Sequence, residues 1–377
     1  MSSIKVTNLQ APSAASPAIV LAADGTATAQ LSSLNGGALS GARNCIINGD
    51  MRIDQRNAGA AVTSPTGYTL DRWNINTNLS SVCTIQQNAG SITPPAGFTN
   101  YLGATSTAAT SLSTANYFQL RQPIEGFNSS DLAWGTANAK TVTVSFWAYS
   151  SLTGTFSGSI RNNPNFTYAY PFSYSIPSAN TWTYVTVTIP GPNASQGTWN
   201  TNNTSGLEVV FCLGAGTSLL STANSWQAGT FAGVTGSVQI LATNGATFYI
   251  TGVQLEAGSV ATPFERRSFG QELALCQRYF QPVGVGAYGR SNSTTSVEMT
   301  AKYNVAMRAT PTITFGGFSG AVTTLDQFGV GSITASAVTS SFGNQNGGHL
   351  VFTVSGATNG ADCASIRGDL ASASAEL

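Results

Sequence analysis

One stretch of the sequence, residues 248–282, changes its hydrophobic period part-way along. Its first part alternates between two faces, as a strand does, with one face made of Tyr249, Thr251, Val253 and Leu255. Apolar residues then recur three and four positions apart, as on one face of a helix: Phe269, Leu273, Cys276 and Phe280. Ser268 and Gln271 have the spacing of a capping box, and Pro282 is expected to stop the helix. We therefore predict one short connecting helix within residues 268–282.

Strand-like alternation dominates the sequence before this helix. Clear runs occur at residues 116–124, 141–150, 181–190 and 207–213, and clusters of Pro, Gly and Asn separate them. Short alternating strands with turns between them are typical of a β-sandwich. We predict an all-β chain in which residues 41–267 form a jelly-roll β-sandwich.

The alternation resumes after the helix. Strand-like runs at residues 297–303, 312–315 and 349–354 are separated by Gly-rich turns. The remaining length is that of an ordinary small domain. We therefore predict that residues 283–377 form a second, smaller β-sandwich-like domain.

Residues 1–40 contain little that a core could bury. Two short extended pieces stand out, made of Ile4, Val6 and Leu9 and of Ile19, Val20 and Leu21. A segment of this size cannot hold a core alone, and such segments often order on a partner. We predict an extended N-terminal arm that docks through these residues, with an unattached tail as the equal alternative.

Charged residues make up only 8% of the chain, and the formal net charge is zero. A neutral chain has no electrostatic reason to bind nucleic acid or an anionic membrane, so we expect neither as a partner. No apolar run approaches the ~20 residues of a membrane span, and no secretory leader is expected. The five cysteines are odd in number and scattered, so we expect free, buried thiols in a protein made in a reducing cytoplasm.

The sequence offers little for catalysis. It has a single histidine, His349, so no multi-histidine metal site exists, and we expect no cofactor and no bound metal. Asp50 and Asp54 are too far apart along an extended chain to act as a glycosidase pair. Asp50 is expected to cap a turn and Asp71 to pair with a nearby arginine. We predict that the protein is not an enzyme.

Aromatic residues are the feature best suited to recognition, because rings match the C–H faces of sugars. Trp199 and Trp226 lie among polar residues, and exposure is expected for them. Tyr168 and Tyr170 belong to an alternating run that continues to Tyr174. Core packing is the favoured interpretation of that run. We retain Trp199, Trp226, Tyr168 and Tyr170 as candidate carbohydrate-binding residues.

Three blocks of sequence carry a family resemblance. They are residues 44–56 (opening Asn-Cys-Ile-Ile-Asn-Gly-Asp), residues 68–73 (Tyr-Thr-Leu-Asp-Arg-Trp) and residues 253–279, which include Val-Gln-Leu-Glu, Pro-Phe-Glu and Cys-Gln-Arg-Tyr. In this order they resemble a family of tailed-bacteriophage virion proteins, mostly tail fibres, over roughly residues 43–282. The opening and the closing strand more distantly resemble jelly-roll carbohydrate-binding modules.

The resemblance implies a structural virion protein, most simply a tail fibre that contributes to host attachment. It implies a location in the virion, on the tail rather than the capsid, and a host cell-surface glycan as a ligand. It also implies that the N-terminal arm docks on other virion proteins. The alternatives are a head fibre, a capsid-decoration or tail-adaptor protein, and a tailspike that cleaves polysaccharide.

We predict that the chain forms a homotrimer. Few charged groups keep the surfaces apart, and few lysines protect the edge strands, so association around an axis would cover both. The number three comes from the resemblance, since phage fibres are usually trimers. Light scattering during gel filtration should give about three times the 38.8 kDa chain mass. A single monomer peak at micromolar concentration would contradict this prediction.

Overall fold

The computed structural model describes residues 8–9, 19–21, 27–29, 43–63, 65–163, 165–315, 323–327, 331–355, 357, 362–364 and 369–377. In the arm, β1 (Asn8–Leu9), β2 (Ile19–Leu21) and β3 (Ala27–Ala29) form a small antiparallel sheet. Ile4 and Val6 lie outside the described residues. Docking of the arm therefore stays a prediction.

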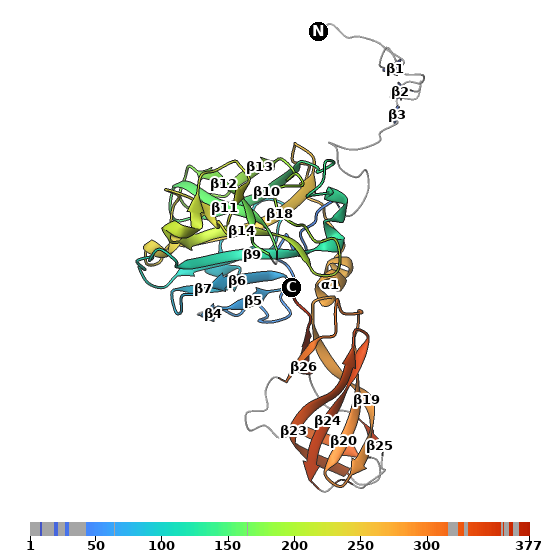
Figure 1. Ribbon diagram of the computed structural model, residues 1–377. Coiled ribbons are helices and arrows are strands. Elements are labelled where there is room, and N and C mark those ends of the chain that lie inside the picture. The colour runs from blue at the N-terminus through green and yellow to red at the C-terminus, as the bar shows by residue number, and fades with distance from the viewer. Residues whose placement is uncertain are drawn as a thin grey trace.

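Two antiparallel sheets make the jelly-roll β-sandwich (Figure 1). The six-stranded sheet has the order β13 (Thr183–Ile189), β10 (Val142–Ser150), β18 (Thr247–Ala257), β8 (Leu102–Ser106), β7 (Cys83–Gln87) and β4 (Val62–Thr63). The seven-stranded sheet has the order β16 (Gln227–Ala228), β12 (Tyr168–Ile176), β11 (Gly154–Asn162), β14 (Ser205–Ala215), β9 (Tyr117–Glu125), β6 (Trp73–Thr77) and β5 (Gly67–Leu70).

Short elements connect these strands. A parallel pair, β15 (Leu220–Ser221) and β17 (Gly233–Val234), lies between β14 and β18 in sequence. The described residues also include single-turn 3₁₀ helices, namely η1 (Ala89–Ser91), η2 (Gly126–Asn128), η3 (Ser130–Leu132), η4 (Thr217–Leu219) and η5 (Ile240–Ala242). Among the described residues, no helix is long and apolar enough to cross a membrane.

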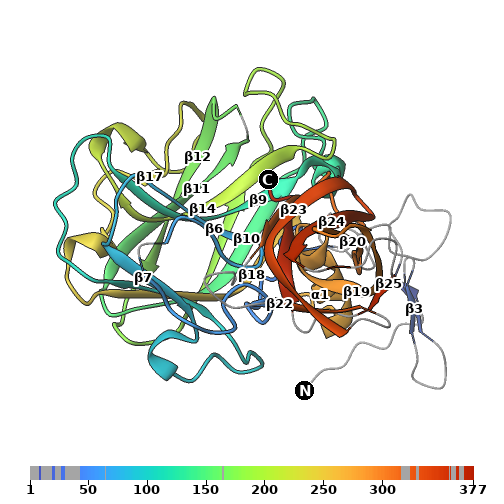
Figure 2. The same ribbon diagram turned by 90° about the horizontal axis from the view of Figure 1, so that it is seen from below.

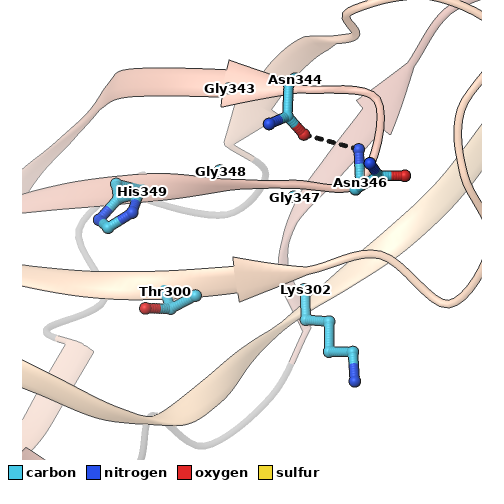
Figure 3. Close-up of a pocket in the computed structure, with 8 residues that line it drawn as sticks. All are labelled: Thr300, Lys302, Gly343, Asn344, Asn346, Gly347, Gly348 and His349. Atoms are coloured by element: carbon cyan, nitrogen blue, oxygen red, sulfur yellow. Dashed lines mark hydrogen bonds between the residues drawn. The ribbon is translucent and has the colours of Figure 1, made fainter.

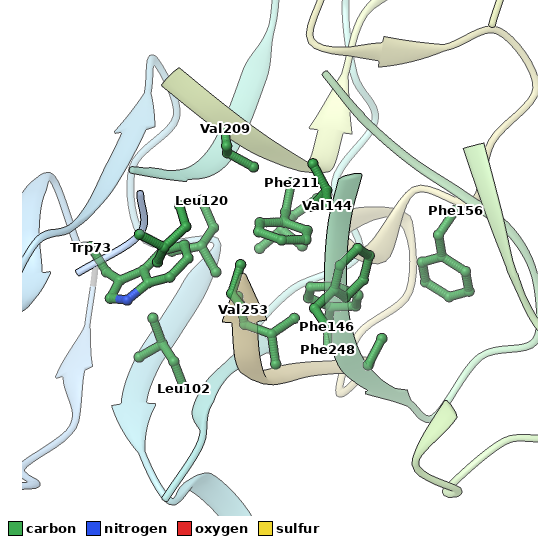
Figure 4. Close-up of a cluster of buried hydrophobic side chains, with 14 of the residues drawn as sticks. Trp73, Leu102, Leu120, Val144, Phe146, Phe156, Val209, Phe211, Phe248 and Val253 are labelled. Atoms are coloured by element: carbon green, nitrogen blue, oxygen red, sulfur yellow. The ribbon is translucent and has the colours of Figure 1, made fainter. Parts of the chain in front are cut away.

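The core fills the space between the two sheets, as the alternation predicted. The predicted face of β10 is buried, namely Val142, Val144, Phe146 and Ala148. Phe146 from one sheet meets Phe211 from the other at 5.0 Å between ring centroids, in an edge-to-face arrangement (Figure 4). Burying each such ring contributes about 1.5–3 kcal/mol, so these contacts hold the sheets together.

The alternation predicted for the last sandwich strand is wrong in its first half. Phe248 and Ile250 face the core, and so do Val253 and Leu255. A β-bulge shifts the register between them, and Gly252 at this point has φ 63°. Glycine adopts that left-handed conformation without a Cβ penalty, so the strand changes phase here.

The N-terminal block of the jelly roll is fastened to this last strand. The Asn44 side chain accepts from Leu255 N at 3.0 Å and donates to Val253 O at 3.1 Å. Gly49 lies against the backbone of β18, and a Cβ atom at this position would be 2.2 Å from the Val253 carbonyl oxygen. Only glycine permits this approach, so residues 43–50 and strand β18 close the sandwich together.

The single α-helix in the described chain, α1 (Phe269–Gln277), has the predicted N-terminus. The Ser268 hydroxyl accepts from Gln271 N, and the Gln271 side chain accepts from Ser268 N, so the capping box is confirmed. The prediction of its end is wrong, because the next strand starts at Phe280 and includes Pro282. The predicted apolar face is also wrong in part, since Phe269 is 56% exposed.

The buried face of α1 is partly polar. Cys276 packs with Tyr279, Ile47 and Ile53, which places the helix against the first block of the jelly roll. Glu272 on the same face accepts from Asn48 N at 2.5 Å. Because the buried position 272 holds a carboxylate, the apolar residues of the sequence indicated a neighbouring face of the helix as the buried one.

The C-terminal domain is β as predicted, and its strands close on themselves. Pairings run from β19 (Phe280–Ser293) through β20 (Ser296–Lys302), β24 (Gly347–Ser355), β23 (Gly331–Asn344), β22 (Thr323–Gln327) and β25 (Asp362–Ala364) back to β19. The first part of β19 instead pairs with β26 (Asp369–Ser374), which pairs with β21 (Thr312–Phe315). Figure 2 shows these strands arranged around a ring. Closure removes exposed sheet edges.

The end of the chain returns to the jelly roll beside α1 (Figure 1). Glu376 forms ion pairs with the guanidinium groups of Arg56, at 2.6 Å, and Arg72. Arg72 is almost fully buried, and its side chain also donates to Pro123 O at 2.6 Å. The Tyr68 hydroxyl donates to Leu377 O at 2.9 Å. These contacts join the last residues of the second domain to the first.

We predict that Glu376→Gln destabilises the protein by about 3–5 kcal/mol, because it leaves the buried Arg72 charge without its carboxylate. Glu298→Gln is the matched control. Its partner His349 is half exposed, so the change should cost less than about 1 kcal/mol. Urea unfolding of the three proteins measures the difference. Equal midpoints for both variants would show that the Glu376 pairs contribute little.

A second carboxylate of the jelly roll, Asp71, makes the unfolding free energy depend on pH. Asp71 is buried, and its two oxygens accept from Gln55 N and Nε2 at 2.7 Å each, so its predicted arginine partner is replaced by Gln55. Burial raises the pKa of Asp71 to about 6. The folded state therefore holds this proton at pH values where the unfolded chain, with a pKa near 3.8, has lost it.

It follows that the contribution of Asp71 to the unfolding free energy falls as pH rises from about 4 to 6, by up to about 3 kcal/mol. In Asp71→Asn this titration is absent. The difference in unfolding free energy between wild type and variant should therefore change over that window and be flat above it. A difference that stays constant from pH 4 to 7 would contradict the raised pKa.

Candidate functional site

The outer face of the seven-stranded sheet carries a row of polar side chains. On β9, Phe118 and Leu120 face the core, so Tyr117, Gln119 and Arg121 point the other way. The neighbouring strand β6 places two amides on the same face, since Asn74 pairs in register with Arg121 and Asn76 with Gln119. We call this surface the polar face.

An ion-pair cluster lies at the centre of the polar face. Glu208 on β14 is 0% exposed and accepts from Arg121 Nη1 at 2.9 Å and from Arg161 Nε at 2.7 Å. The Asn163 amide also donates to this carboxylate, at 2.9 Å. Both carboxylate oxygens are thus used, and they hold the two guanidinium groups in place.

The second guanidinium is held on several sides. Arg161, which is 4% exposed, donates from Nη2 to Gln119 Oε1 at 2.9 Å and from Nη1 to Thr230 O at 3.2 Å. The Phe166 ring lies over it, with 5.5 Å between the guanidinium carbon and the ring centroid. Arg161 is therefore rigidly placed, with its flat face covered by an aromatic ring.

Phe166 reaches this position through an unusual backbone conformation. Its φ is 50°, which is rare for a bulky residue. The buried Asn162 side chain holds the loop, because its oxygen accepts from Thr167 N and Tyr168 N at 2.8 and 2.9 Å. Strain of this kind persists only where surrounding contacts impose it, so the β11–β12 connection is built to present this ring.

These groups line a cavity of about 160 Å³ that opens to solvent. Its lining residues are Asn76, Tyr117, Gln119, Arg161, Phe166, Leu219 and Thr230. Gln119 and Arg161 are engaged with protein partners. Among the described residues, no hydrogen bond involves the Asn76 amide or the Tyr117 hydroxyl. Two rings and two uncommitted polar groups therefore meet in one recess.

The predicted aromatic candidates lie elsewhere, in a packing cluster. Trp199, Trp226 and the buried Trp134 meet edge to face, with ring centroids 4.8–5.6 Å apart. Tyr170 is buried and packs on Trp226 at 5.3 Å. The indole N–H groups of Trp199 and Trp226 donate to Gln196 O and Pro190 O. Trp199 and Trp226 are half-buried, which differs from the exposure expected for them.

Tyr168 is half-buried at the start of β12 and does not line the cavity. A carbohydrate-binding role for the four predicted residues stays a prediction. Tyr117, Gln119 and Arg121 were accessible to sequence reasoning, because they alternate with the core residues of a strand that was recognised. No sequence signal marked Phe166.

A second aromatic surface lies on the outer face of the six-stranded sheet. Trp147 and Tyr184 are cross-strand neighbours with ring centroids 5.2 Å apart, and Tyr184 is 46% exposed. Next to them, Tyr149 stacks on Tyr249 at 5.2 Å. This surface offers a group of neighbouring aromatic rings.

Two further pockets lie outside the jelly-roll faces. One on the C-terminal domain has a volume of about 500 Å³ and presents Thr300, Lys302, Asn344, Asn346 and His349 at its rim (Figure 3). Its side chains are exposed, and His349 pairs with Glu298 at 2.9 Å. The other, of about 680 Å³, lies between α1 and residues 305–306 and includes three arginines.

The remaining candidate groups are structural. Asp54, rather than Asp50, caps a turn, accepting from Asn57 N and Gly59 N, and Asp50 pairs with Arg52 at 2.9 Å. The free cysteines Cys45, Cys83, Cys212 and Cys276 are buried, and burial raises the pKa of each thiol. In the part of the chain that the structure describes, no three His, Cys, Asp or Glu side chains are placed to hold a metal ion.

No protein-family model and no curated protein matches the chain. Solved structures do. A protein described as CBM4 is 15% identical, with 56% of this chain and 97% of that chain covered at a TM-score of 0.28. A putative sugar binding protein from Bacteroides thetaiotaomicron is 16% identical. The match covers 57% of this chain and 99% of that chain at a TM-score of 0.32.

A family 11 carbohydrate-binding module of a Clostridium thermocellum cellulase is 12% identical, with 55% and 98% covered at a TM-score of 0.25. At such TM-scores these similarities carry no conclusion about what this chain binds. The strand pairings define the jelly-roll sandwich.

Proposed function

We propose that the protein is a non-catalytic glycan-binding component of a tailed-phage virion, most simply a tail fibre. The observation that carries the glycan-binding part is the recess on the polar face. The virion part is supported by the sequence resemblance over residues 43–282, and attachment through the arm belongs to the same proposal.

Sugar recognition needs ring faces for C–H contacts and amides or hydroxyls for the sugar hydroxyl groups. The recess combines the rings of Tyr117 and Phe166 with the free amide of Asn76. Its floor is held by charge-assisted hydrogen bonds, so little ordering accompanies binding. The recess accepts one sugar residue, and because it is open, a longer glycan would extend into solvent.

The geometry favours binding without cleavage. Glycoside hydrolysis uses a pair of carboxyl groups about 5–9.5 Å apart. Glu208, the carboxylate that binds the recess-lining Arg161, is fully buried, and its two oxygens accept hydrogen bonds from Arg121, Arg161 and Asn163. It does not line the cavity. We therefore propose retention of the glycan and not its hydrolysis.

The test is a glycan array carrying bacterial surface polysaccharides, read with wild type and with Asn76→Ala/Tyr117→Ala. We expect wild type to bind a subset of spots and the double variant to lose at least about 10-fold in affinity, equivalent to ~1.4 kcal/mol. Both replaced side chains are partly exposed, so the fold should be retained, which a thermal melt checks.

Tyr184→Ala is the matched control, because it removes an exposed ring from the other sheet. Loss of binding in Tyr184→Ala alone would move the site to the six-stranded sheet. Release of oligosaccharide from the bound polysaccharides would overturn the non-catalytic proposal.

A further inference from the structure

The charges of the polar face do not balance. Arg121 and Arg161 share one carboxylate, Glu208, so the cluster carries one excess positive charge. Its members are 16%, 5% and 0% exposed at the side chain. A buried charge without a partner is unfavourable, and proteins normally pair such charges.

Neighbouring carboxylates are committed to other partners. Glu125, at the end of the same strand β9, pairs with Arg278 at 2.6 Å and accepts from the Tyr279 hydroxyl. Glu376 is held by Arg56 and Arg72. Among the described residues, Glu208 is the only carboxylate within ion-pair distance of Arg121 or Arg161.

Donors remain for a second anion. Among the described residues, the hydrogen bonds of Arg121 use Nε and Nη1, which leaves Nη2, and those of Arg161 leave one N–H of Nη1. Arg161 lines the recess, and Arg121 follows Gln119 on the same face of β9. A carboxylate is the anion whose planar geometry matches a guanidinium group.

We propose that the recess selects a carboxylate-bearing sugar, such as a hexuronic acid residue. The sugar carboxylate lies against Arg161, within the field of both arginines. The Asn76 amide and the Tyr117 hydroxyl bind ring hydroxyl groups, and Phe166 supports the sugar face. This inference rests on the proposed glycan-binding function and adds the class of sugar.

The test compares oligomers of galacturonic, glucuronic and mannuronic acid with their carboxyl-methyl esters by titration calorimetry. Each pair has the same ring and differs only in charge. For at least one pair, wild type should bind the acid about 10- to 100-fold more tightly than the ester, the range expected for a charge-assisted hydrogen bond. The preference should shrink as salt rises, because the site opens to solvent.

Arg121→Gln removes the excess charge without touching Arg161. Glu208 keeps Arg161 and Asn163 as partners, so the cluster stays paired. We expect the preference for the acid to fall severalfold in Arg121→Gln, which keeps the Arg161 donor but lacks the excess charge, with ester binding unchanged. The preference should persist in Arg121→Lys, which keeps the charge. The lysine variant separates a charge effect from a packing effect.

Equal binding of acid and ester in all three pairs would overturn the inference and leave glycan binding intact. So would an acid preference that is undiminished in Arg121→Gln. Absence of binding to every acid and ester, together with a blank glycan array, would overturn the proposed function itself.

Discussion

The fold depends on hydrogen bonds between the first block of the jelly roll and its last strand. Asn44 bridges Val253 and Leu255 with its side chain, and Glu265 accepts from Asn44 N at 2.8 Å. Further on, Asn48 N donates to Glu272 of α1. The Asn48 amide also donates to Asp71 O at 3.0 Å. Hydrogen bonds thus join the three sequence blocks that carried the resemblance, and they close the sandwich and hold the helix against it.

Prediction from sequence succeeded where burial follows a simple period. The core faces of β9, β10 and β14 and the capping box of α1 belong to this class, because alternation and local hydrogen bonding are set by nearby residues. It failed at Gly252, where a bulge changes the phase, and at Glu272, where a buried carboxylate replaces an apolar residue. Each failure depends on a contact between residues far apart in sequence.

The recess lies apart from the aromatic residues that the sequence singled out. Rings and amides were expected to bind sugar, yet Trp199 and Trp226 pack on Trp134 because three indoles at the sandwich edge shield one another from water. The recess instead uses the outward side of strand β9 and a ring from the β11–β12 connection. Its assembly requires the strand order β11–β14–β9–β6, which alternation within one strand does not encode.

Many of the few charged residues in this chain form buried ion pairs. Arg56, Arg72, Arg161 and Arg267 all pair with carboxylates in positions that are mostly buried. Such pairs allow one relative orientation of the packed elements, whereas apolar contacts would permit several orientations. Because these charges are buried, the outer surface consists mainly of neutral polar residues. On a surface of this kind, one unbalanced guanidinium beside an open recess is a distinct electrostatic feature, since few neighbouring charges screen it or compete for the same anion. In the binding role that we propose, the scarcity of other charges favours selection of an anionic ligand at the polar face.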